Sequence, residues 1–462
     1  MNQAAEQFDF VIIGSGAAGE SALDTARERG ATAAIVDDDL FGGSCAYWAC
    51  MPSKALLHAA AVHHGGGDFP WAKASDFRDW MISREGIDYP DDSSHEAGYR
   101  RVGGVPIRGR GRIVGPGRVD VTVKDGAVRQ LAARFIVVAV GSTSRIPAMD
   151  GLDRIHAWTN REGTSTRVLP RSLLVMGGGP TGVELAQVYL RYGVPLTIID
   201  SNDRIISRDH PRNSAALTEA LVREGGVVRT GVRALRVVEG GGADGAHRVE
   251  LSDGSTVEGH EILVAIGRAI PLDGLGLETV GVSIEHGLKP DATLRVAENV
   301  FVVGDPAGPE LHTHLAHYEG DMAVRIALGD AVRPDFRAIP RATYTDPETA
   351  SVGLRLEEAE AAGHDAIERT IDLGPTAKGY VTQSSGHVTA VVDRASETLL
   401  GAFIAGPGAS ETIHEAVLAL KLRVPMRVLA DTIHAFPTTA RVMGTLFIQV
   451  AHELEESRPA DE

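Results

Sequence analysis

Two segments of this chain repeat one pattern: an apolar run, a glycine-rich turn, a helix-like stretch and a second apolar run that ends on an acidic residue. The first copy, from residue 8, contains Gly14, Gly16, Gly19 and Asp37, and the second, from residue 172, contains Gly177, Gly179, Gly182 and Asp200. Such a turn lets the backbone approach a pyrophosphate at the N-terminus of the following helix, and the acid accepts hydrogen bonds from a ribose hydroxyl. The alternative is a turn that only packs a helix on a strand, but two complete copies favour nucleotide binding. The sequence therefore predicts two dinucleotide-binding βαβ units.

The other segments of the 462 residues follow different patterns. Residues 105–140 and 228–266 alternate apolar and polar positions, which predicts antiparallel strands. Residues 60–100 predict a long helix followed by an irregular acidic stretch, residues 88–96, which we interpret as solvated surface rather than a recognition loop. From about residue 341 the pattern predicts an α+β module, with strands over residues 388–393 and 399–405 and helices over residues 354–362 and 410–421.

The charge and the apolar content exclude several classes of partner. The formal net charge is −17, so we expect neither a nucleic acid nor an anionic membrane as a partner. No stretch approaches the ~20 apolar residues that span a bilayer. The first residues lack the basic region and apolar core of a secretion signal. These features predict a cytoplasmic protein.

The two cysteines, Cys45 and Cys50, lie close together within residues 42–54. In a reducing cytoplasm such a pair is more often catalytic or metal-binding than structural, and two thiols alone cannot complete a tetrahedral zinc site. Cysteines at this spacing at the start of a helix can close a disulfide, and a helix N-terminus favours the reactive thiolate. Pro52 suits the first turn of that helix. The alternative is a pair of small buried hydrophobic residues, but we favour redox chemistry.

These motifs, in this order along essentially the whole chain, resemble those of the flavoprotein disulfide reductases, the family of dihydrolipoamide dehydrogenase, glutathione reductase and mercuric reductase. The family's redox segment is similar to residues 42–54, and its flavin-domain and nucleotide-domain signatures are similar to residues 138–142 and 264–268. Gly304-Asp305 looks like the second FAD motif, followed by a helix similar to residues 316–320. Residues 345–353 look like the start of the dimer-interface domain.

The resemblance implies an α/β fold with two Rossmann-like dinucleotide-binding domains plus an α+β C-terminal dimerisation domain. It assigns residues 1–150 and 270–340 to FAD binding, residues 151–269 to NAD(P) binding and residues 341–462 to dimerisation. Because the last domain of family members completes the active site of a neighbouring subunit, we expect a homodimer.

The resemblance also implies a role for each matching residue. The first unit would bind FAD together with Gly43, Ser44 and Gly141, and Asp305 would bind the ribityl chain. The second unit would bind the nicotinamide nucleotide, together with Gly267.

Four residues match the family's reaction centre. Lys54 and Glu184 match the pair near the flavin N5, where a lysine stabilises negative charge on the reduced ring. Cys50 matches the sulfur against the flavin, and Cys45 matches the sulfur that attacks the substrate.

The residues after Asp200 bear on the choice of nucleotide. The chain continues Ser-Asn-Asp-Arg204, with no basic residue directly placed to receive a 2′-phosphate. An acid at this position repels that phosphate, so NADH is the expected cofactor. Arg204 and Arg208 keep NADPH as the alternative.

The C-terminal segment departs from the family pattern. Thiol–disulfide members carry a histidine directly before a proline and a glutamate five places later, and this pair is the acid/base supplied across the dimer. Phe436 and Arg441 stand at those positions, and neither exchanges a proton near neutral pH. His434 is the candidate replacement, although a histidine there is more often structural. Phe-Pro at this point resembles mercuric reductases, which carry an additional C-terminal cysteine pair that this chain lacks.

Two other groups of residues have alternative interpretations. Tyr47 and Trp48, between the cysteines, either shape the disulfide face for a flat or unusual acceptor or only fill space beneath the flavin domain. His312, His314 and His317 lie where the family's flavin-contacting helix begins, and no carboxylate or thiol completes a ligand pattern, so we expect no metal.

The leading hypothesis is an NAD(P)H-dependent oxidoreductase that passes hydride to FAD, electrons to a Cys45–Cys50 disulfide, and both electrons on to a small-molecule acceptor. One alternative runs this reaction backwards and oxidises a dithiol substrate. Another reduces a quinone, dye or metal ion directly. A third is a flavin redox sensor with little turnover, against which both complete βαβ units and the Lys54/Glu184 pair argue.

Overall fold

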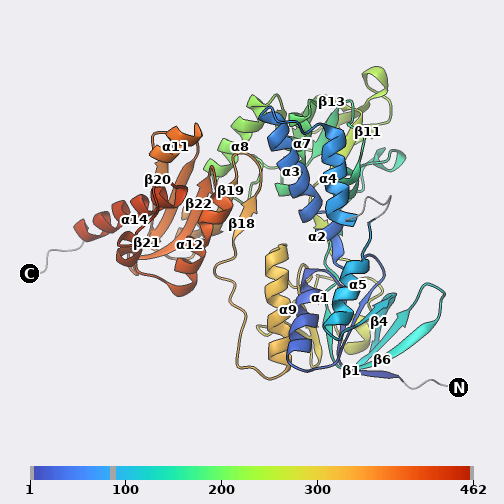
Figure 1. Ribbon diagram of the computed structural model, residues 1–462. Coiled ribbons are helices and arrows are strands. Elements are labelled where there is room, and N and C mark those ends of the chain that lie inside the picture. Colours follow the sequence, from blue (N-terminus) through green and yellow to red (C-terminus); the bar gives the residue numbers. More distant parts are fainter. Residues whose placement is uncertain (1–4, 84–89, 458–462) are drawn as a thin grey trace, which may run out of the picture.

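The structure is a computed structural model that describes residues 5–83 and 90–457 (Figure 1). Its elements form three groups: the two predicted nucleotide units and the C-terminal module, which is drawn in orange and red.

The first unit is the predicted βαβ unit, with β1 (Glu6–Ile13), α1 (Ala17–Glu28) and β2 (Ala33–Asp37). β1 lies between β2 and β6, parallel to both. The sheet runs in the order β16-β17-β6-β1-β2-β3, and β5 pairs antiparallel with β6 while β4 pairs antiparallel with β5. Its remaining strands are β3 (Val105–Arg108), β4 (Arg110–Gly115), β5 (Arg118–Thr122), β6 (Val128–Val138), β16 (Arg295–Ala297) and β17 (Val300–Val302).

The first sheet is therefore completed by strands that follow the second unit in the sequence. After β17 the chain enters α9 (Thr313–Ala327), which lies beside α1 in Figure 1. Gly320 permits this close approach, because a Cβ there would lie 2.3 Å from the main-chain oxygen of Ala18. The contact places the N-terminus of α9 next to the first glycine-rich turn.

The second unit is parallel throughout its main sheet, in the order β10-β9-β8-β14. An antiparallel meander of β11, β12 and β13 adjoins it, as the alternating pattern predicts. The prediction is wrong for the two ends of residues 228–266, because β10 and β14 are parallel strands of the main sheet. Its elements are β8 (Leu173–Met176), α7 (Pro180–Arg191), β9 (Leu196–Ile199), α8 (Pro211–Arg223), β10 (Val227–Arg229), β11 (Ala234–Val238), β12 (His247–Leu251), β13 (Thr256–Gly259) and β14 (Glu261–Val264).

The chain crosses between the two units twice, and the two crossings pair with each other. β7 (Thr143–Ser144) leaves the first unit, β15 (Arg268–Ala269) returns to it, and the two are antiparallel. This pairing places Arg268 opposite Ser144 and Ala269 opposite Thr143, so the two crossings lie side by side.

The expectation of a long helix before the acidic stretch of residues 88–96 is wrong. The chain forms α3 (Cys50–His64), α4 (Trp71–Ser83) and α5 (Ser93–Arg101), with α2 (Gly43–Tyr47) before them. Three successive glycines separate α3 from α4, and Gly66 adopts a left-handed φ of +85°, which a helix cannot continue. Residues 84–89, part of the expected acidic stretch, lie outside the described residues.

The helices α3 and α4 follow β2 in the sequence but pack on the second unit. Leu56 of α3 and Trp71 are buried in one hydrophobic core with Val183 and Leu185 of α7. This packing carries the cysteine segment from the first unit to the second.

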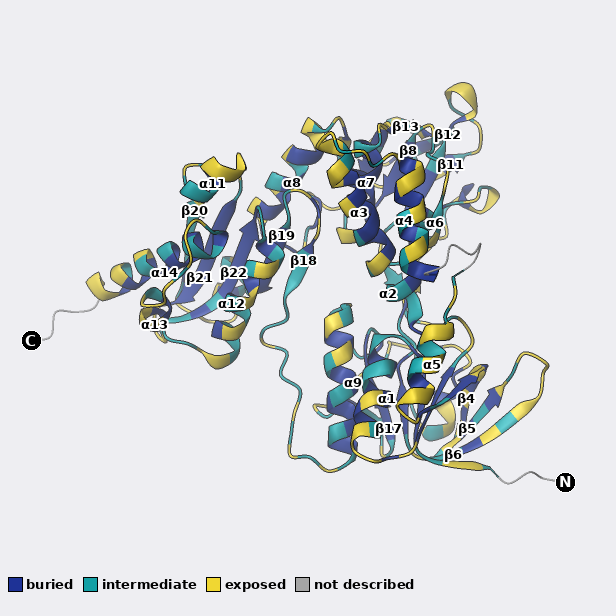
Figure 2. Ribbon diagram, viewed as in Figure 1, coloured by how far each residue is buried: buried dark blue, intermediate teal, exposed yellow. Residues whose placement is uncertain are grey.

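The C-terminal module is the predicted α+β unit. Its antiparallel sheet has the order β18-β19-β22-β21-β20, and its core is shared with α12, α13 and α14. Figure 2 shows the buried strands beneath partly exposed helices. The elements are β18 (Arg341–Thr343), β19 (Thr349–Gly353), α10 (Leu356–Ala361), β20 (Ala366–Asp372), α11 (Ala377–Thr382), β21 (His387–Asp393), β22 (Thr398–Ala405), α12 (Ala409–Leu422), α13 (Met426–Ala430) and α14 (Thr439–Glu456).

The predicted fold class is confirmed: two parallel α/β units precede an α+β module. Across residues 5–83 and 90–457, the helices are all too short or too polar to cross a membrane.

Candidate active site

The two cysteines meet at a threonine that the sequence analysis did not single out. Cys45 lies in α2, Cys50 is the first residue of α3, and Thr313 is the first residue of α9. The Thr313 hydroxyl donates a hydrogen bond to Cys45 Sγ at 3.4 Å and also lies 3.4 Å from Cys50 Sγ. Thr313 begins the helix that follows the Gly304-Asp305 motif, and this position is the one feature of the sequence that could have pointed to it.

The surroundings of the two thiols act on them in opposite directions. The pKa of Cys50 is lowered to about 6, first by a hydrogen bond from Cys45 and then by Thr313 and the Lys54 ammonium, although burial opposes the change. The same hydrogen bond, together with burial, raises the pKa of Cys45. The reduced pair therefore holds its negative charge on Cys50 and its proton on Cys45.

Lys54 and Glu184 form an ion pair beside the cysteines, as the resemblance predicted. Lys54 Nζ lies 2.7 Å from Glu184 Oε2, and the Glu184 side chain is only 6% exposed. The other carboxylate oxygen, Oε1, accepts the main-chain N–H of Tyr344 at 3.0 Å. Each oxygen of this buried carboxylate thus has a partner, as burial requires.

The two glycine-rich turns have the same backbone geometry. Gly14 and Gly177 both have φ +106°, and a Cβ on either would lie within 2.4 Å of a main-chain oxygen, of Ala139 or Ala265 respectively. No side chain caps the helix that follows each turn, α1 or α7. The free amide groups at both helix N-termini therefore suit an anionic group such as a pyrophosphate.

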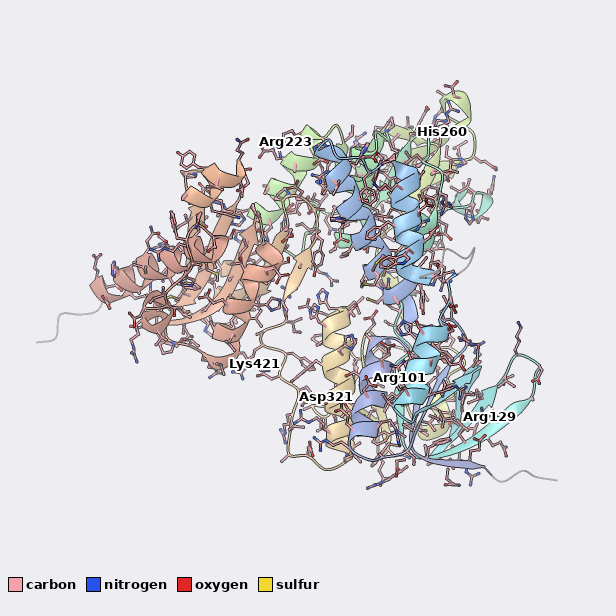
Figure 3. The ribbon with its side chains drawn as sticks, viewed as in Figure 1. Arg101, Arg129, Arg223, His260, Asp321 and Lys421 are labelled. Atoms are coloured by element: carbon pink, nitrogen blue, oxygen red, sulfur yellow. The ribbon has the colours of Figure 1, made fainter. Side chains whose placement is uncertain are left out.

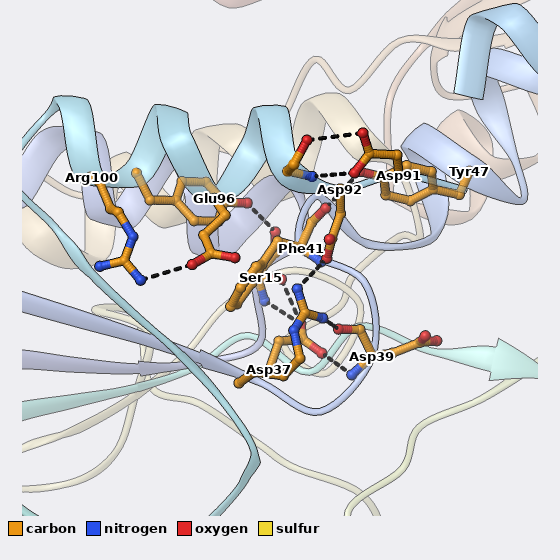
Figure 4. Close-up of polar contacts among 12 residues, drawn as sticks. Ser15, Asp37, Asp39, Phe41, Tyr47, Asp91, Asp92, Glu96 and Arg100 are labelled. Atoms are coloured by element: carbon orange, nitrogen blue, oxygen red, sulfur yellow. Dashed lines mark hydrogen bonds and ion pairs between the residues drawn. The ribbon is translucent and has the colours of Figure 1, made fainter. Parts of the chain in front are cut away.

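The acids at the strand ends hold these turns in place. Asp37 Oδ2 accepts both the N–H of Ser15, at 2.8 Å, and its hydroxyl, at 2.6 Å (Figure 4). Asp200 Oδ2 likewise accepts the N–H of Gly178 at 2.6 Å. A carboxylate has about four lone-pair sites, so each acid retains capacity for a ribose hydroxyl.

The second carboxylate oxygen of Asp200 is also hydrogen-bonded. Asp200 Oδ1 accepts both the main-chain N–H and the side-chain amide of Asn202, each at 2.7 Å. In both units, the acid predicted to bind a ribose therefore also holds the glycine-rich turn in its conformation.

The redox segment rests directly on the first turn. Gly43 has a φ of +68°, and a Cβ there would lie 2.7 Å from the Cα of Gly16. Gly42 also donates its N–H to the Ser15 oxygen at 3.1 Å. Ser44 lies one residue further, where its main-chain oxygen accepts from Trp48. The predicted cofactor residues Gly43 and Ser44 therefore adjoin the first turn. Residue 43 must be a glycine, because any Cβ there would collide with Gly16.

The two family signatures meet at Asp305. Ser142 follows Gly141 and donates its hydroxyl to Asp305 Oδ2, and Arg268, which follows Gly267, donates to the Ser142 hydroxyl. Arg268 Nη2 also donates to the Ser142 main-chain oxygen at 2.6 Å. Ser142 and Arg268, which are 126 positions apart in the sequence, thus converge near the acid predicted to bind the ribityl chain.

A buried glutamate behind this acid was not identified from the sequence. Glu319 Oε2 accepts the main-chain N–H of Gly304 at 2.6 Å, and the residue is fully buried. Burial raises its pKa to about 8, and the neighbouring Asp305 charge adds to the effect. Glu319 is therefore protonated at neutral pH.

Part of the acidic stretch is structural rather than solvated. Asp92 accepts the N–H of Phe41 at 2.7 Å and also pairs with Arg108, so it ties the start of α5 to the loop before α2 (Figure 4). Our interpretation of this stretch as solvated surface is wrong for Asp92. The side chain of Asp92 is only 15% exposed.

The rings between the cysteines fill space. Tyr47 and Trp48 are buried against Ile82, and the Tyr47 hydroxyl donates to the Phe41 oxygen at 2.9 Å. The Trp48 oxygen accepts from Asn160 at 2.6 Å. These contacts support the packing interpretation over a face shaped for an acceptor.

His434 is held within the C-terminal module. Its Nε2 lies 2.8 Å from Glu415 Oε1, its Nδ1 lies 2.9 Å from the Thr432 oxygen, and its side chain is 5% exposed. Phe436, at the family's histidine position, is 73% exposed. With both ring nitrogens engaged, His434 fits the structural role better than the catalytic one.

The histidines near Thr313 have other partners. His312 Nε2 lies 2.9 Å from Glu310 Oε2, and His314 Nε2 lies 2.9 Å from the main-chain oxygen of Pro340. The rings of His312 and His314 stack at 5.0 Å. They tie the N-terminus of α9 to the segment that enters the C-terminal module.

Comparison with known proteins decides the family. The family of the pyridine nucleotide-disulphide oxidoreductases matches residues 8–320, and the dimerisation domain of the same family matches residues 339–447. The chain belongs to this family of enzymes. A dihydrolipoyl dehydrogenase of Chlorobaculum tepidum is 33% identical, over 95% of this chain and 96% of the relative. A mercuric reductase of Streptomyces lividans is 32% identical, over 96% of each.

Solved structures agree with this membership. The crystal structure of LpdA from Mycobacterium tuberculosis matches with a TM-score of 0.85 and 26% identity, covering 96% of this chain and 100% of that one. The HOCl-induced flavoprotein disulfide reductase RclA of Escherichia coli has the same fold, with a TM-score of 0.85 and 20% identity, covering 96% of this chain and 99% of that one.

The family is dependent on FAD and a nicotinamide nucleotide, as predicted. The residues of this pyridine nucleotide-disulphide oxidoreductase fit the two groups. Uncapped helix N-termini face each glycine-rich turn, and each turn has an acid at its strand end. When bound, FAD accepts hydride from a reduced nicotinamide and supplies electrons to a neighbouring disulfide.

Replacing Thr313 by valine should raise the pKa of Cys50. The variant Thr313→Val keeps the shape of the side chain but removes the hydroxyl that stabilises the thiolate. A hydrogen bond to a charged group is worth enough for a shift of about one pH unit. The rate of iodoacetamide alkylation at Cys50, followed against pH by peptide mass spectrometry, measures it. Thr218→Val, on α8, is the matched control and should leave the midpoint where it was.

Glu319 should make the protein less stable as pH rises. Its pKa is about 8 in the folded state against 4.5 ordinarily, so between these values the unfolded state loses the proton that the folded state keeps. Stability from this group is therefore greatest below about pH 4.5 and falls until about pH 8. Glu319→Gln keeps the acceptor for Gly304 and should remove this fall, a gain of a few kcal/mol, roughly, near pH 8.

Urea unfolding at several pH values tests the effect of Glu319. The exposed Glu360→Gln on α10 is the control and should follow the wild type. A Glu319→Gln protein with the full pH dependence of the wild type would contradict the assignment.

Proposed function

We propose that this enzyme takes hydride from NADH, uses FAD to pass two electrons to a Cys45–Cys50 disulfide, and reduces a small-molecule acceptor. The contact of Thr313 with both sulfurs, at 3.4 Å each, carries the proposal. The Lys54–Glu184 pair, one helical turn along α3, supplies a positive charge beside Cys50. We also propose that residues 1–150 and 270–340 bind FAD, residues 151–269 the nicotinamide nucleotide, and residues 341–462 a second subunit. A cytoplasmic location stays a prediction.

The two sulfurs divide the work of disulfide reduction. Two electrons break the S–S bond, Cys50 is left as a thiolate because of its lowered pKa, and Cys45 takes up one proton. Toward a disulfide acceptor, Cys45 attacks and forms a mixed disulfide, which releases the first acceptor thiol. Cys50 then closes the Cys45–Cys50 bond and releases the second. The released thiolates take up the protons that complete the balance.

The surroundings of Asp200 support NADH over NADPH. The carboxylate sits at the strand end where a 2′-phosphate would lie, and like charges repel. Arg204 does not offset it, because its Nη2 donates to the main-chain oxygen of Ser207 at 2.8 Å. NADPH requires a free cation there, and Arg208, which is exposed, is the remaining alternative.

The raised pKa of Cys45 favours a second candidate activity. A neutral thiol must lose its proton before it attacks a disulfide, and Phe436 and Arg441 stand where the family has its acid/base. A quinone or a metal ion accepts electrons without a leaving thiol to protonate. Direct reduction of such an acceptor is therefore the alternative, and the reverse reaction on a dithiol meets the same lack of a base.

Turnover of disulfides by the unmodified enzyme should be slow while its flavin is reduced rapidly by NADH. General acid–base catalysis is worth roughly 10²–10⁴-fold in rate, and Phe436→His with Arg441→Glu should recover part of it. Stopped-flow absorbance measures the reduction of the flavin by NADH. Steady-state assays measure turnover of lipoamide, dihydrolipoamide, glutathione disulfide and a quinone. His434→Ala is the control: its effect on turnover should not exceed its effect on stability.

Rapid dihydrolipoamide oxidation that His434→Ala abolishes would contradict the structural role of His434. A flavin that NADH does not reduce would contradict the proposed function as a whole.

A homodimer is the expected assembly, because the dimerisation domain of the family is present. Several large apolar side chains of this domain are exposed in one chain: Ile433 (97%), Phe436 (73%), Leu422 (65%) and Leu418 (59%). Leu418 and Leu422 are four positions apart, so they share one face of α12. Apolar surface of this kind marks a contact with another chain.

Charges on α12 should break the dimer. Leu418→Glu with Leu422→Glu places two carboxylates on the exposed face, where burial against a second copy would leave them unpaired. Sedimentation velocity should show a dimer for the wild type and a monomer for this variant. Val168→Glu, at a still more exposed apolar residue outside the domain, should stay dimeric.

A further inference from the structure

Tyr344 contacts both members of the Lys54–Glu184 pair. Its ring centroid lies 4.6 Å from Lys54 Nζ, and its main-chain N–H donates to Glu184 Oε1 at 3.0 Å. An ammonium over an aromatic face is attracted by the negative face of the ring. One residue at the entrance of the C-terminal module therefore touches both charges beside the cysteines.

The segment that carries Tyr344 is fixed on α7. Gln187 Nε2 donates to the Asp346 oxygen at 2.8 Å, and its Oε1 accepts from the Asp346 N–H at 2.7 Å. Arg191 Nη2 lies 2.8 Å from Asp346 Oδ2. Glu184, Gln187 and Arg191 are spaced by three and four positions, so they lie on one face of the helix. These contacts leave Tyr344 little freedom to move away from Lys54.

The position of Lys54 matters because its charge acts on Cys50. The ammonium lowers the pKa of Cys50, whereas the Glu184 carboxylate raises it. The titratable groups acting on Cys50 include Cys45 of α2, Lys54 of α3, Glu184 of α7 and Tyr344. The Lys54 side chain is 36% exposed, so without a second contact the long side chain would spend time in water.

We propose that Tyr344 is a positioning residue for the Lys54–Glu184 pair. Its ring holds the ammonium and its main-chain N–H holds the carboxylate, so that the first segment of the dimerisation domain sets the charge beside Cys50. The inference rests on the proposed function for the use of Cys50 in electron transfer. It also gives the C-terminal module a part in the chemistry of its own chain.

Loss of the ring should weaken the thiolate at Cys50. In reduced full-length protein, Tyr344→Leu should raise the pH midpoint of Cys50 alkylation by iodoacetamide on the order of half a pH unit. Tyr344→Phe keeps the ring and should restore the wild-type midpoint. Tyr380→Leu, which removes an exposed ring on α11, is the matched control and should not change it. If the leucine variant unfolds, Tyr344→Met keeps the bulk without the ring and takes its place.

A double-mutant cycle shows whether Tyr344 acts through Lys54. In a Lys54→Met background, Tyr344→Leu should produce no further shift of the Cys50 midpoint. An equal shift with and without Lys54, or a shift with Tyr344→Phe as large as with leucine, would overturn the inference.

This experiment is independent of turnover. An unchanged midpoint in a protein whose flavin NADH reduces would overturn the role of Tyr344 alone. A shifted midpoint in a protein that NADH does not reduce would support Tyr344 and contradict the proposed function.

Discussion

The ion pair between Lys54 and Glu184 joins the parts of this molecule that have to work together. It links α3, which carries Cys50, to α7, which follows the second glycine-rich turn. A carboxylate as deeply buried as Glu184 costs free energy unless both oxygens are paired, and Lys54 and the Tyr344 N–H supply the two partners. The pair therefore constrains the cysteine segment, the second unit and the C-terminal module at one point.

The glycine-rich turns of the two nucleotide units have the same backbone geometry. In each, the first glycine takes a backbone conformation that other residues avoid, and the strand-end acid accepts an N–H of the turn. The acid thus organises the turn as well as offering oxygens to a ribose. The surroundings of the two turns differ. Gly43 of the redox segment lies against Gly16 of the first turn, whereas no described residue apart from its neighbours in the chain lies within 4 Å of a Cβ placed on Gly179 of the second.

The site is well suited to hold electrons and less suited to move protons. Cys50 carries the charge of the reduced pair, and Cys45 keeps a proton with a raised pKa. The family position for a proton acceptor is an exposed phenylalanine, and the nearby His434 is engaged by Glu415. This imbalance is the reason for the second activity proposed above, because thiol exchange requires proton transfers that the reduction of a quinone or metal ion does not.

Local pattern in the sequence determined the two βαβ units, the α+β module and the closeness of Cys45 to Cys50, because apolar periodicity, glycine turns and short spacings act between near neighbours. The long helix expected before the acidic stretch of residues 88–96 was wrong, because three glycines separate α3 from α4. Only the tertiary structure placed Thr313 between the sulfurs, Glu319 behind Asp305, and Tyr344 over Lys54. These contacts join residues more than 250 positions apart, or depend on burial, and both arise from packing that no local pattern encodes.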